Sequence, residues 1–221
     1  MYRPLELGDY MDYKEVLVLS TALRTVTDCA KKYRDNLVHK NLLYVYGSSN
    51  NKEYIETYFL PSHYLHLTGL KYNGSALKFY YECIEDRLSI RDISYKDEST
   101  SQKLMVLSPL VNIHQTVNII GDYDGNRQFL ITNKLAGTIS ACMGFNEDTD
   151  NPGYYYPNTA LRENIKNLSV NTKRVIAVYR KMTNDDKYTE RTYLASNITP
   201  ESLTLPKEIQ DKLDDSLIPF Q

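Results

Sequence analysis

Two side chains that could act on a phosphodiester lie two positions apart in residues 64–70, whose sequence is YLHLTGL. Apolar and polar residues alternate here, and alternate side chains of an extended chain point to opposite faces. Leu65 and Leu67 would then enter a core, while His66 and Thr68 would lie side by side on the other face. The pattern therefore predicts a strand that presents a histidine and a hydroxyl. The structural alternative is a partly buried histidine with a satisfied hydrogen bond.

Cleavage of RNA without a metal has three chemical requirements. A base takes the proton of the 2′-hydroxyl, an acid protonates the leaving 5′-oxygen, and a cation stabilises the charge that grows on the phosphorane. His66 can be base or acid, because the ordinary pKa of histidine lies near neutrality. Lys134 lies in a turn before residues 138–145, an alternating segment that predicts a strand with Ser140 on one face, and Arg180 falls in a further predicted strand. Such side chains on one sheet surface could bind a phosphate.

The other histidines are weaker candidates for a metal site or for a second acid–base residue. His63 and His66 have a spacing that suits metal ligation on a helix, but Pro61 and the alternation disfavour a helix there, so we expect no metal site. His114, at the end of a predicted helix, is a poor second histidine for a paired acid–base site. The sequence also lacks the phosphate-loop, dinucleotide-binding, HExxH and GxSxG motifs, which argues against the common ATPases, dehydrogenases, metalloproteases and serine hydrolases.

The bulk composition is that of an ordinary globular protein. The chain has 221 residues, of which 42% are hydrophobic and 24% charged. No apolar run approaches the length of a membrane span, and residues 1–6 lack the plan of a signal peptide, so we expect a cytoplasmic protein with no membrane partner. The cysteines are odd in number and far apart, which favours small buried residues over a disulfide framework or a zinc site (Cys29, Cys83 and Cys142).

Charge and aromatic content leave nucleic-acid binding open. The net charge is −2, and the acidic residues that follow position 200 leave the rest of the chain close to neutral, so a local basic patch is compatible with it. The chain has 20 tyrosines and no tryptophan. Tyrosine is a good base-stacking and interface residue, although compositional drift would explain the same excess.

The first half of the chain predicts mostly helices. Apolar residues recur at three- and four-residue steps over 12–35, which predicts a long helix. Two strands follow as a hairpin over 41–46 and 54–59. Further helices are predicted over 75–87 and 100–114, and Pro109 must bend or split the second of them.

The second half predicts mostly strands. They cover residues 117–123, 128–132 and 138–145, and a final hairpin is predicted over 174–180 and 188–194. A short helix is expected near 160–168 and another around 206–213. Helices followed by strands with tight turns indicate an α+β fold with an antiparallel sheet.

The order of several short motifs is similar to that of a known family. The motifs are YLHLTG at 64–69, Phe79-Tyr80, Lys103-Leu104, IGDY at 120–123, KLAG at 134–137, ACMGF at 141–145, YYPNT at 155–159 and RVIAVYRK at 174–181. Together they resemble the phage and mobile-element branch of the barnase–EndoU–colicin–RelE-like (BECR-fold) nucleases. The resemblance covers roughly residues 10–198.

The resemblance implies N-terminal helices with a curved antiparallel sheet in a single nuclease domain over residues 1–198, followed by a short acidic C-terminal helix or tail over 199–221. It implies a metal-independent ribonuclease without a cofactor, acting as a toxin or effector of a phage or mobile element in the cytoplasm of a bacterial host. The expected partners are RNA, such as tRNA or mRNA, and an inhibitor or host protein. The residues at matching positions are His66, Thr68, Lys134, Ser140 and Arg180.

We therefore predict His66 as the acid–base residue, Thr68 and Ser140 as phosphate contacts, and Lys134 or Arg180 as the cation that stabilises the transition state. Two other readings stay open. One is a non-catalytic phage-derived protein that binds RNA or a host protein with the same surface. The other is a nucleotide-using transferase, such as an ADP-ribosyltransferase, which NAD would protect from unfolding.

Overall fold

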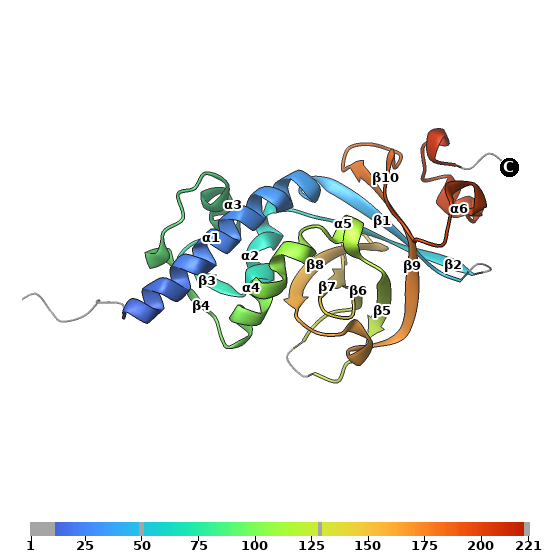
Figure 1. The fold of residues 1–221 in the computed structure, drawn as a ribbon. Coiled ribbons are helices and arrows are strands. Elements are labelled where there is room, and N and C mark those ends of the chain that lie inside the picture. The colour runs from blue at the N-terminus through green and yellow to red at the C-terminus, as the bar shows by residue number, and fades with distance from the viewer. Residues whose placement is uncertain (1–11, 49–50, 128–129, 219–221) are drawn as a thin grey trace, which may run out of the picture.

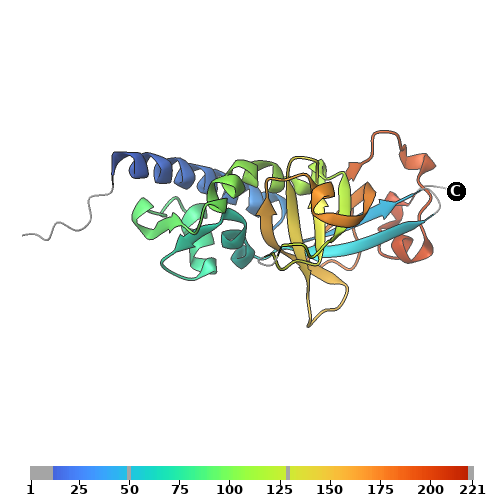
Figure 2. The same ribbon diagram turned by 90° about the horizontal axis from the view of Figure 1, so that it is seen from below.

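The computed structural model describes residues 12–48, 51–127 and 130–218. Helices occupy one side of the molecule and a β-barrel the other (Figure 1), and the view from below shows the same two parts side by side along the long axis (Figure 2). Helical and strand segments are both present, which agrees with the predicted mixture of helices and sheet.

The helical part is arranged around one long amphipathic helix. Helix α1, Tyr13–Asn36, confirms the helix predicted over 12–35 and buries a stripe of residues at three- and four-residue steps: Leu19, Ala22, Val26, Cys29, Ala30 and Tyr33. This stripe packs against α3, Ala76–Ile84, and α4, Ser99–Leu110. Pro109 lies in the last turn of α4, and α5, Ile113–Thr116, follows as a separate turn, so the helix predicted over 100–114 is split.

Residues 64–70 do not form the predicted strand. Pro61–His63 is a 3-10 helix that runs directly into α2, Tyr64–Thr68, and only Leu70–Tyr72 is extended, as strand β3, which pairs with β4, Ile93–Tyr95. Leu67 is fully buried in the helical core and Leu65 is partly buried against it. The apolar residues thus enter a core as predicted, but from a helix.

The main sheet closes into a barrel. Its strands are β1, Lys40–Gly47; β2, Lys52–Tyr58; β5, Ile119–Tyr123; β6, Lys134–Gly137; β7, Cys142–Glu147; β8, Tyr154–Leu161; β9, Ser169–Met182; and β10, Glu190–Leu194. They pair in the order β1-β2-β8-β7-β6-β5-β9, with β10 also on β9. Strand β9 pairs with β5 through its first half and with β1 through its second half.

That double use of β9 corrects the predicted curved antiparallel sheet, because the two edges of the sheet meet. The β2–β8 pair is also parallel, whereas every other pair of the barrel is antiparallel. The two predicted hairpins, β1–β2 and β9–β10, are confirmed.

The strands of the middle segment are displaced from their predicted positions. The strand predicted over 128–132 contains Gln128 and Phe129, which lie outside the described residues, and the strand that returns from β5 is β6. Residues 138–141 form the turn between β6 and β7, so the alternating segment 138–145 is a strand only from Cys142 onward. The helix predicted near 160–168 is limited to the 3-10 helix Ile165–Asn167, because β8 continues to Leu161.

The barrel interior is continuous with the core under the helices. Tyr44, Phe59 and Phe145 are almost fully buried there, and Phe145 makes edge-to-face contacts with both of the others, at ring-centroid distances of 6.4 and 6.2 Å. Such pairs stabilise a core by about 0.5–1.5 kcal/mol beyond their buried area. The barrel and the helices are therefore joined by one hydrophobic core.

The C-terminal segment covers the outer face of the barrel. Leu203, Leu205, Ile209 and Leu213 pack on Leu43, Val45, Ile176 and Tyr179 of β1 and β9. This segment contains the short helix α6, Lys207–Gln210, within the helix predicted around 206–213. The division into a nuclease domain over 1–198 and a tail over 199–221 stays a prediction.

Two expectations from composition concern the cysteines and membrane-spanning segments. The three cysteines are free and buried, as predicted. Among the described residues, no helix has the length and apolar character that crossing a membrane requires. The expected lack of a signal peptide concerns residues 1–6, which lie outside the described residues.

Candidate functional site

Helix α2 and the 3-10 helix that leads into it present two histidines on one helical surface. Pro61 occupies the first turn of the 3-10 helix, where its missing N–H costs nothing, and Gly69 ends α2 in the left-handed conformation, with φ of 70°. Residues three apart on a helix are neighbours, so His63 and His66 lie on the same side. The second histidine that the sequence seemed to lack is therefore His63.

His66 is exposed at the surface of α2. Its pKa is lowered from the ordinary value, first by partial burial of the ring and then by the positive charges of Lys96 and Lys103. The imidazole is therefore mostly neutral at neutral pH, which is the form that accepts a proton.

The ring of His63, unlike that of His66, is fixed by a hydrogen bond from the backbone. Its Nδ1 accepts a hydrogen bond from the Leu60 backbone N–H at 3.2 Å, so the neutral ring carries its proton on Nε2. Burial, followed by the charge of His66, lowers the pKa of His63 to about 4. His63 therefore offers a neutral N–H donor beside His66 across the physiological pH range.

Lys103 of α4 completes this histidine–lysine site, which we define as His63, His66, Lys96 and Lys103. The Lys103 Nζ donates to the backbone oxygen of His66 at 3.4 Å. Burial and then the charge of Lys96 lower the pKa of Lys103, against a smaller raising effect of Asp97. An ammonium group whose pKa is lowered in this way releases its proton more readily than an exposed lysine.

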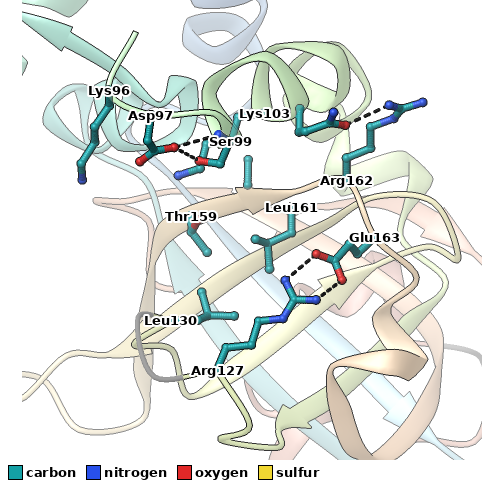
Figure 3. Close-up of a pocket in the computed structure, with 12 residues that line it drawn as sticks. Lys96, Asp97, Ser99, Lys103, Arg127, Leu130, Thr159, Leu161, Arg162 and Glu163 are labelled. Atoms are coloured by element: carbon teal, nitrogen blue, oxygen red, sulfur yellow. Dashed lines mark hydrogen bonds and ion pairs between the residues drawn. The ribbon is translucent and has the colours of Figure 1, made fainter.

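A wide groove extends from the histidine–lysine site along β8. Its volume is about 1070 Å³, and its lining includes Lys96, Lys103, Arg127, Thr159, Leu161 and Arg162. Figure 3 shows the two lysines on the α4 side and Arg127 on the opposite side, with Thr159 and Leu161 of β8 between them. We call this feature the cationic groove.

Four cationic and two acidic side chains line the cationic groove. Arg127 forms a two-bonded ion pair with Glu163, and Arg162 donates to Gln102 at 2.9 Å. Asp97 accepts hydrogen bonds from the backbone and hydroxyl of Ser99 at the start of α4. The acidic groups are thus engaged locally, and the two lysines leave an excess of positive charge that suits a polyanion.

Thr68 lies beside His66 in sequence but not in space. Its side chain is fully buried, its hydroxyl donates to the Leu65 oxygen at 2.8 Å, and it accepts from the Leu70 N–H at 3.1 Å. The expectation of a shared open face was wrong, because the chain is helical here and the hydroxyl closes the helix end.

Lys134 lies at one mouth of the barrel. It forms an ion pair with Asp122, next to a second pair between Lys173 and Glu53. The pocket that these residues line has a volume of about 20 Å³, room for about one water molecule.

Ser140 and Arg180 lie apart from His66, from Lys134 and from each other. Ser140 is exposed in the β6–β7 turn, with its Oγ 3.2 Å from the Thr138 Oγ1. Arg180 is bound to Glu190 and to the Asn36 carbonyl oxygen, beside buried His114. The predicted residues therefore do not converge on one sheet surface. The catalytic roles assigned to them stay predictions.

Sequence reasoning missed His63, Lys96, Lys103, Arg127 and Arg162 as site residues. The usable signal was the proline at 61 and the glycine at 69, which bracket a short helix. The helical spacing of His63 and His66 also suits a metal. However, no group of three or more histidine, cysteine, aspartate or glutamate side chains that could hold a metal ion occurs in the described part of the chain.

Gly69 allows Lys103 to cross the end of α2. A Cβ at this position would lie 2.9 Å from the Lys103 Cδ and 3.2 Å from the Thr100 Cα. We expect Gly69→Ala to lower the free energy of unfolding by about 1–2 kcal/mol, through the left-handed backbone and through these contacts. Urea denaturation measures this effect.

Gly125→Ala is the matched control for Gly69→Ala. Gly125 has φ of 75°, but nothing lies within 4 Å of its added Cβ, so only the backbone cost of about 1 kcal/mol applies. If the two variants lose equal stability, the close approach of Lys103 at Gly69 contributes nothing to the cost of Gly69→Ala.

A comparison with known protein families finds one match over most of the chain. Residues 25–197 match the family described as phage-Barnase-EndoU-ColicinE5/D-RelE like nuclease 4. No curated protein and no solved structure is significantly similar to the chain.

Proposed function

Because the chain belongs to the phage-Barnase-EndoU-ColicinE5/D-RelE like nuclease family, we propose that it is a ribonuclease that cleaves RNA without a metal, at His66 and Lys103. Family membership supports nuclease activity. The observation that supports this site is the grouping of two histidines with two lysines beside the cationic groove, in which Lys103 donates to the His66 backbone oxygen and the charges of Lys96 and Lys103 help to lower the pKa of His66.

In the proposed reaction, neutral His66 takes the proton of a ribose 2′-hydroxyl. The 2′-oxygen forms a bond to phosphorus, and the bond from phosphorus to the 5′-oxygen of the next nucleotide breaks. The products are a 2′,3′-cyclic phosphate and a free 5′-hydroxyl. The lowered pKa of His66 keeps the base unprotonated at neutral pH.

Lys103 is the proposed acid. Its ammonium donates a proton to the leaving 5′-oxygen, and its positive charge, together with that of Lys96, stabilises the phosphorane. The lowered pKa of Lys103 favours this proton transfer. The proton that His66 has taken is then lost to water and Lys103 is reprotonated from water, so both residues return to their starting forms.

His63 contributes as a neutral donor. With its Nδ1 engaged by Leu60, its Nε2–H can hydrogen-bond to a non-bridging phosphate oxygen. A fixed neutral donor stabilises the developing charge and leaves His66 to act as the base. The remaining groove cations, Arg127 and Arg162, would hold flanking phosphates.

The biological role that we propose is that of a toxin or effector of a phage or mobile element, acting on RNA in a bacterial host. Support for this role comes from the family to which the chain belongs. Lys134, Ser140 and Arg180 lie away from the groove, so alanine variants at these positions test whether they have any part in cleavage.

The decisive experiment incubates the purified protein with single-stranded RNA in excess EDTA. We expect cleavage that EDTA does not prevent, products that end in 2′,3′-cyclic phosphate, and no cleavage at a position where a 2′-deoxy nucleotide removes the nucleophile. End-group analysis by mass spectrometry gives the readout.

Other outcomes separate the alternatives. Cleavage that stops in EDTA, or that proceeds equally on DNA, would contradict the mechanism. Binding of RNA without turnover would identify a non-catalytic RNA-binding protein. Protection from thermal unfolding by NAD, without RNA cleavage, would favour the transferase.

A further inference from the structure

Three aromatic rings meet at the edge of the histidine–lysine site, and one of them, Tyr156, comes from a distant part of the sequence. Tyr58 ends β2, His63 precedes α2 and Tyr156 lies in β8. The rings of His63 and Tyr156 stack at a centroid distance of 5.4 Å and an angle of 30°, and Tyr58 lies 5.7 Å from His63 and 6.2 Å from Tyr156. All three residues are partly exposed, so the ring cluster forms part of the surface.

A pocket of about 530 Å³ opens against Tyr58. Its lining combines this ring and Leu60 with polar groups from four further positions, Asn41, Asp148, Asn151 and Thr183, and with Tyr154. The Tyr58 hydroxyl donates to Asp148 at 3.0 Å, and Asn151 donates to the same carboxylate at 2.8 Å. Aromatic surface with a few fixed polar groups is the composition of a site for a flat, polar ring.

The pocket and the cationic groove have no lining residue in common, but neighbouring residues connect them. His63 belongs both to the ring cluster and to the histidine–lysine site. Tyr156 and Thr159 lie on the same strand, and Thr159 lines the groove. Tyr58 of the pocket thus contacts His63, His66 follows three residues later, and Lys103 of the groove donates to the His66 backbone oxygen.

The groove and the pocket differ in charge, and this difference matches the two parts of a nucleotide. The groove carries the cations, whereas the described residues that line the pocket at Tyr58 include no lysine or arginine and include the carboxylate of Asp148. A nucleotide has the complementary division, with charge on its phosphate and a flat, hydrogen-bonding base without charge. Aromatic side chains bind such bases by stacking.

We propose that the Tyr58 pocket is a nucleobase subsite that takes one unstacked base of single-stranded RNA, next to the phosphate held at His66. This inference rests on the proposed function. A base within a duplex is stacked and paired, so it reaches the Tyr58 ring only after leaving the helix. The subsite therefore makes the enzyme selective for single strands, loops and ends.

The test uses a binding probe that the enzyme cannot cleave, a fluorescently labelled 2′-O-methyl oligoribonucleotide, and measures anisotropy. Tyr58→Leu removes the ring and keeps an apolar side chain, and Tyr58→Phe keeps the ring and removes the hydroxyl. We expect Tyr58→Leu to weaken binding of the single strand by about tenfold or more, and Tyr58→Phe by less than about threefold. The same probe as a duplex should bind at least about tenfold more weakly to the wild type, with no difference among the variants.

Equal effects of Tyr58→Leu and Tyr58→Phe, equal affinity for single strand and duplex, or no binding of the single strand would each overturn the subsite. Thermal unfolding checks that both variants fold, and Tyr156→Leu, which removes the neighbouring ring, replaces Tyr58→Leu if that variant does not. Ring-dependent binding without cleavage of any RNA would refute the proposed reaction and leave the subsite. Cleavage with ring-independent binding would do the reverse.

Discussion

Replacing His66 with alanine is expected to reduce the rate of RNA cleavage by about 10²–10⁴-fold, because the variant loses the base that takes the 2′-hydroxyl proton. His66 is exposed, and its ring forms no hydrogen bond within the part of the chain that the structure describes, so the melting temperature should stay within about 2 °C of the wild type. Single-turnover cleavage of a labelled RNA, at saturating enzyme, measures the chemical step directly.

The control for His66→Ala is His39→Asn. His39 is also exposed, and its φ of 57° is a conformation that asparagine adopts readily. This variant should cleave RNA at the wild-type rate. Full activity of His66→Ala would remove His66 from the mechanism, whereas equal losses in both variants would point to a general effect of losing an exposed histidine.

The pH dependence provides a second readout for His66. A base works in its unprotonated form, so the cleavage rate should fall on the acid side as pH drops through the pKa of His66. Burial and the charges of Lys96 and Lys103 place this pKa below the ordinary value of 6.5. Lys96→Gln removes one of these charges, so it should move the acid limb to higher pH.

The amphipathic patterns were sufficient to predict the long helix, both hairpins and the α+β class. They misled at residues 64–70, because alternation over a few residues fits a strand and a short helix equally well. Leu67 faces the same helical core in either conformation, but only the helix brings His63 beside His66. Pro61 and Gly69 at the two ends would have decided for the helix, had they been weighed above the alternation.

Closure of the barrel was beyond sequence reasoning. It depends on β9 pairing with β5 in its first half and with β1 in its second half, and this is a long-range register that no local pattern specifies. The groove was missed for the same reason. Its cations come from α4 and the residues just before it, from the loop after β5 and from the residue that follows β8, and nothing in their spacing along the chain shows that these segments meet.

The second large effect concerns the buried carboxylate of Glu56, on the outer face of β2. Only 6% of its side chain is exposed, and it accepts hydrogen bonds from the Tyr188 hydroxyl at 2.8 Å and the Lys212 Nζ at 2.5 Å. Burial lowers the pKa of Lys212, but the hydrogen bond and charge of Glu56 raise it by more, so the lysine stays charged. This contact joins the C-terminal segment to the barrel.

Lys212→Met should lower the free energy of unfolding by about 2–3 kcal/mol, because it leaves the Glu56 carboxylate buried without the positive charge of Lys212. The estimate is below the usual range for a fully buried pair, since 31% of the Lys212 side chain is exposed. For a chain of this length the melting temperature should fall by about 5–10 °C. Calorimetry or urea denaturation measures the change.

Two further variants distinguish the buried charge from the loss of a lysine. Lys207→Met disrupts the ion pair with Asp211 in the same segment, but both side chains are exposed, so the free energy of unfolding should not change measurably. The double variant Glu56→Gln, Lys212→Met buries no charge, so it should regain most of the stability that Lys212→Met loses. If Lys212→Met is instead as stable as Lys207→Met, water reaches Glu56, and the apolar contacts of Leu203, Leu205, Ile209 and Leu213 hold the segment on the barrel without help from the ion pair.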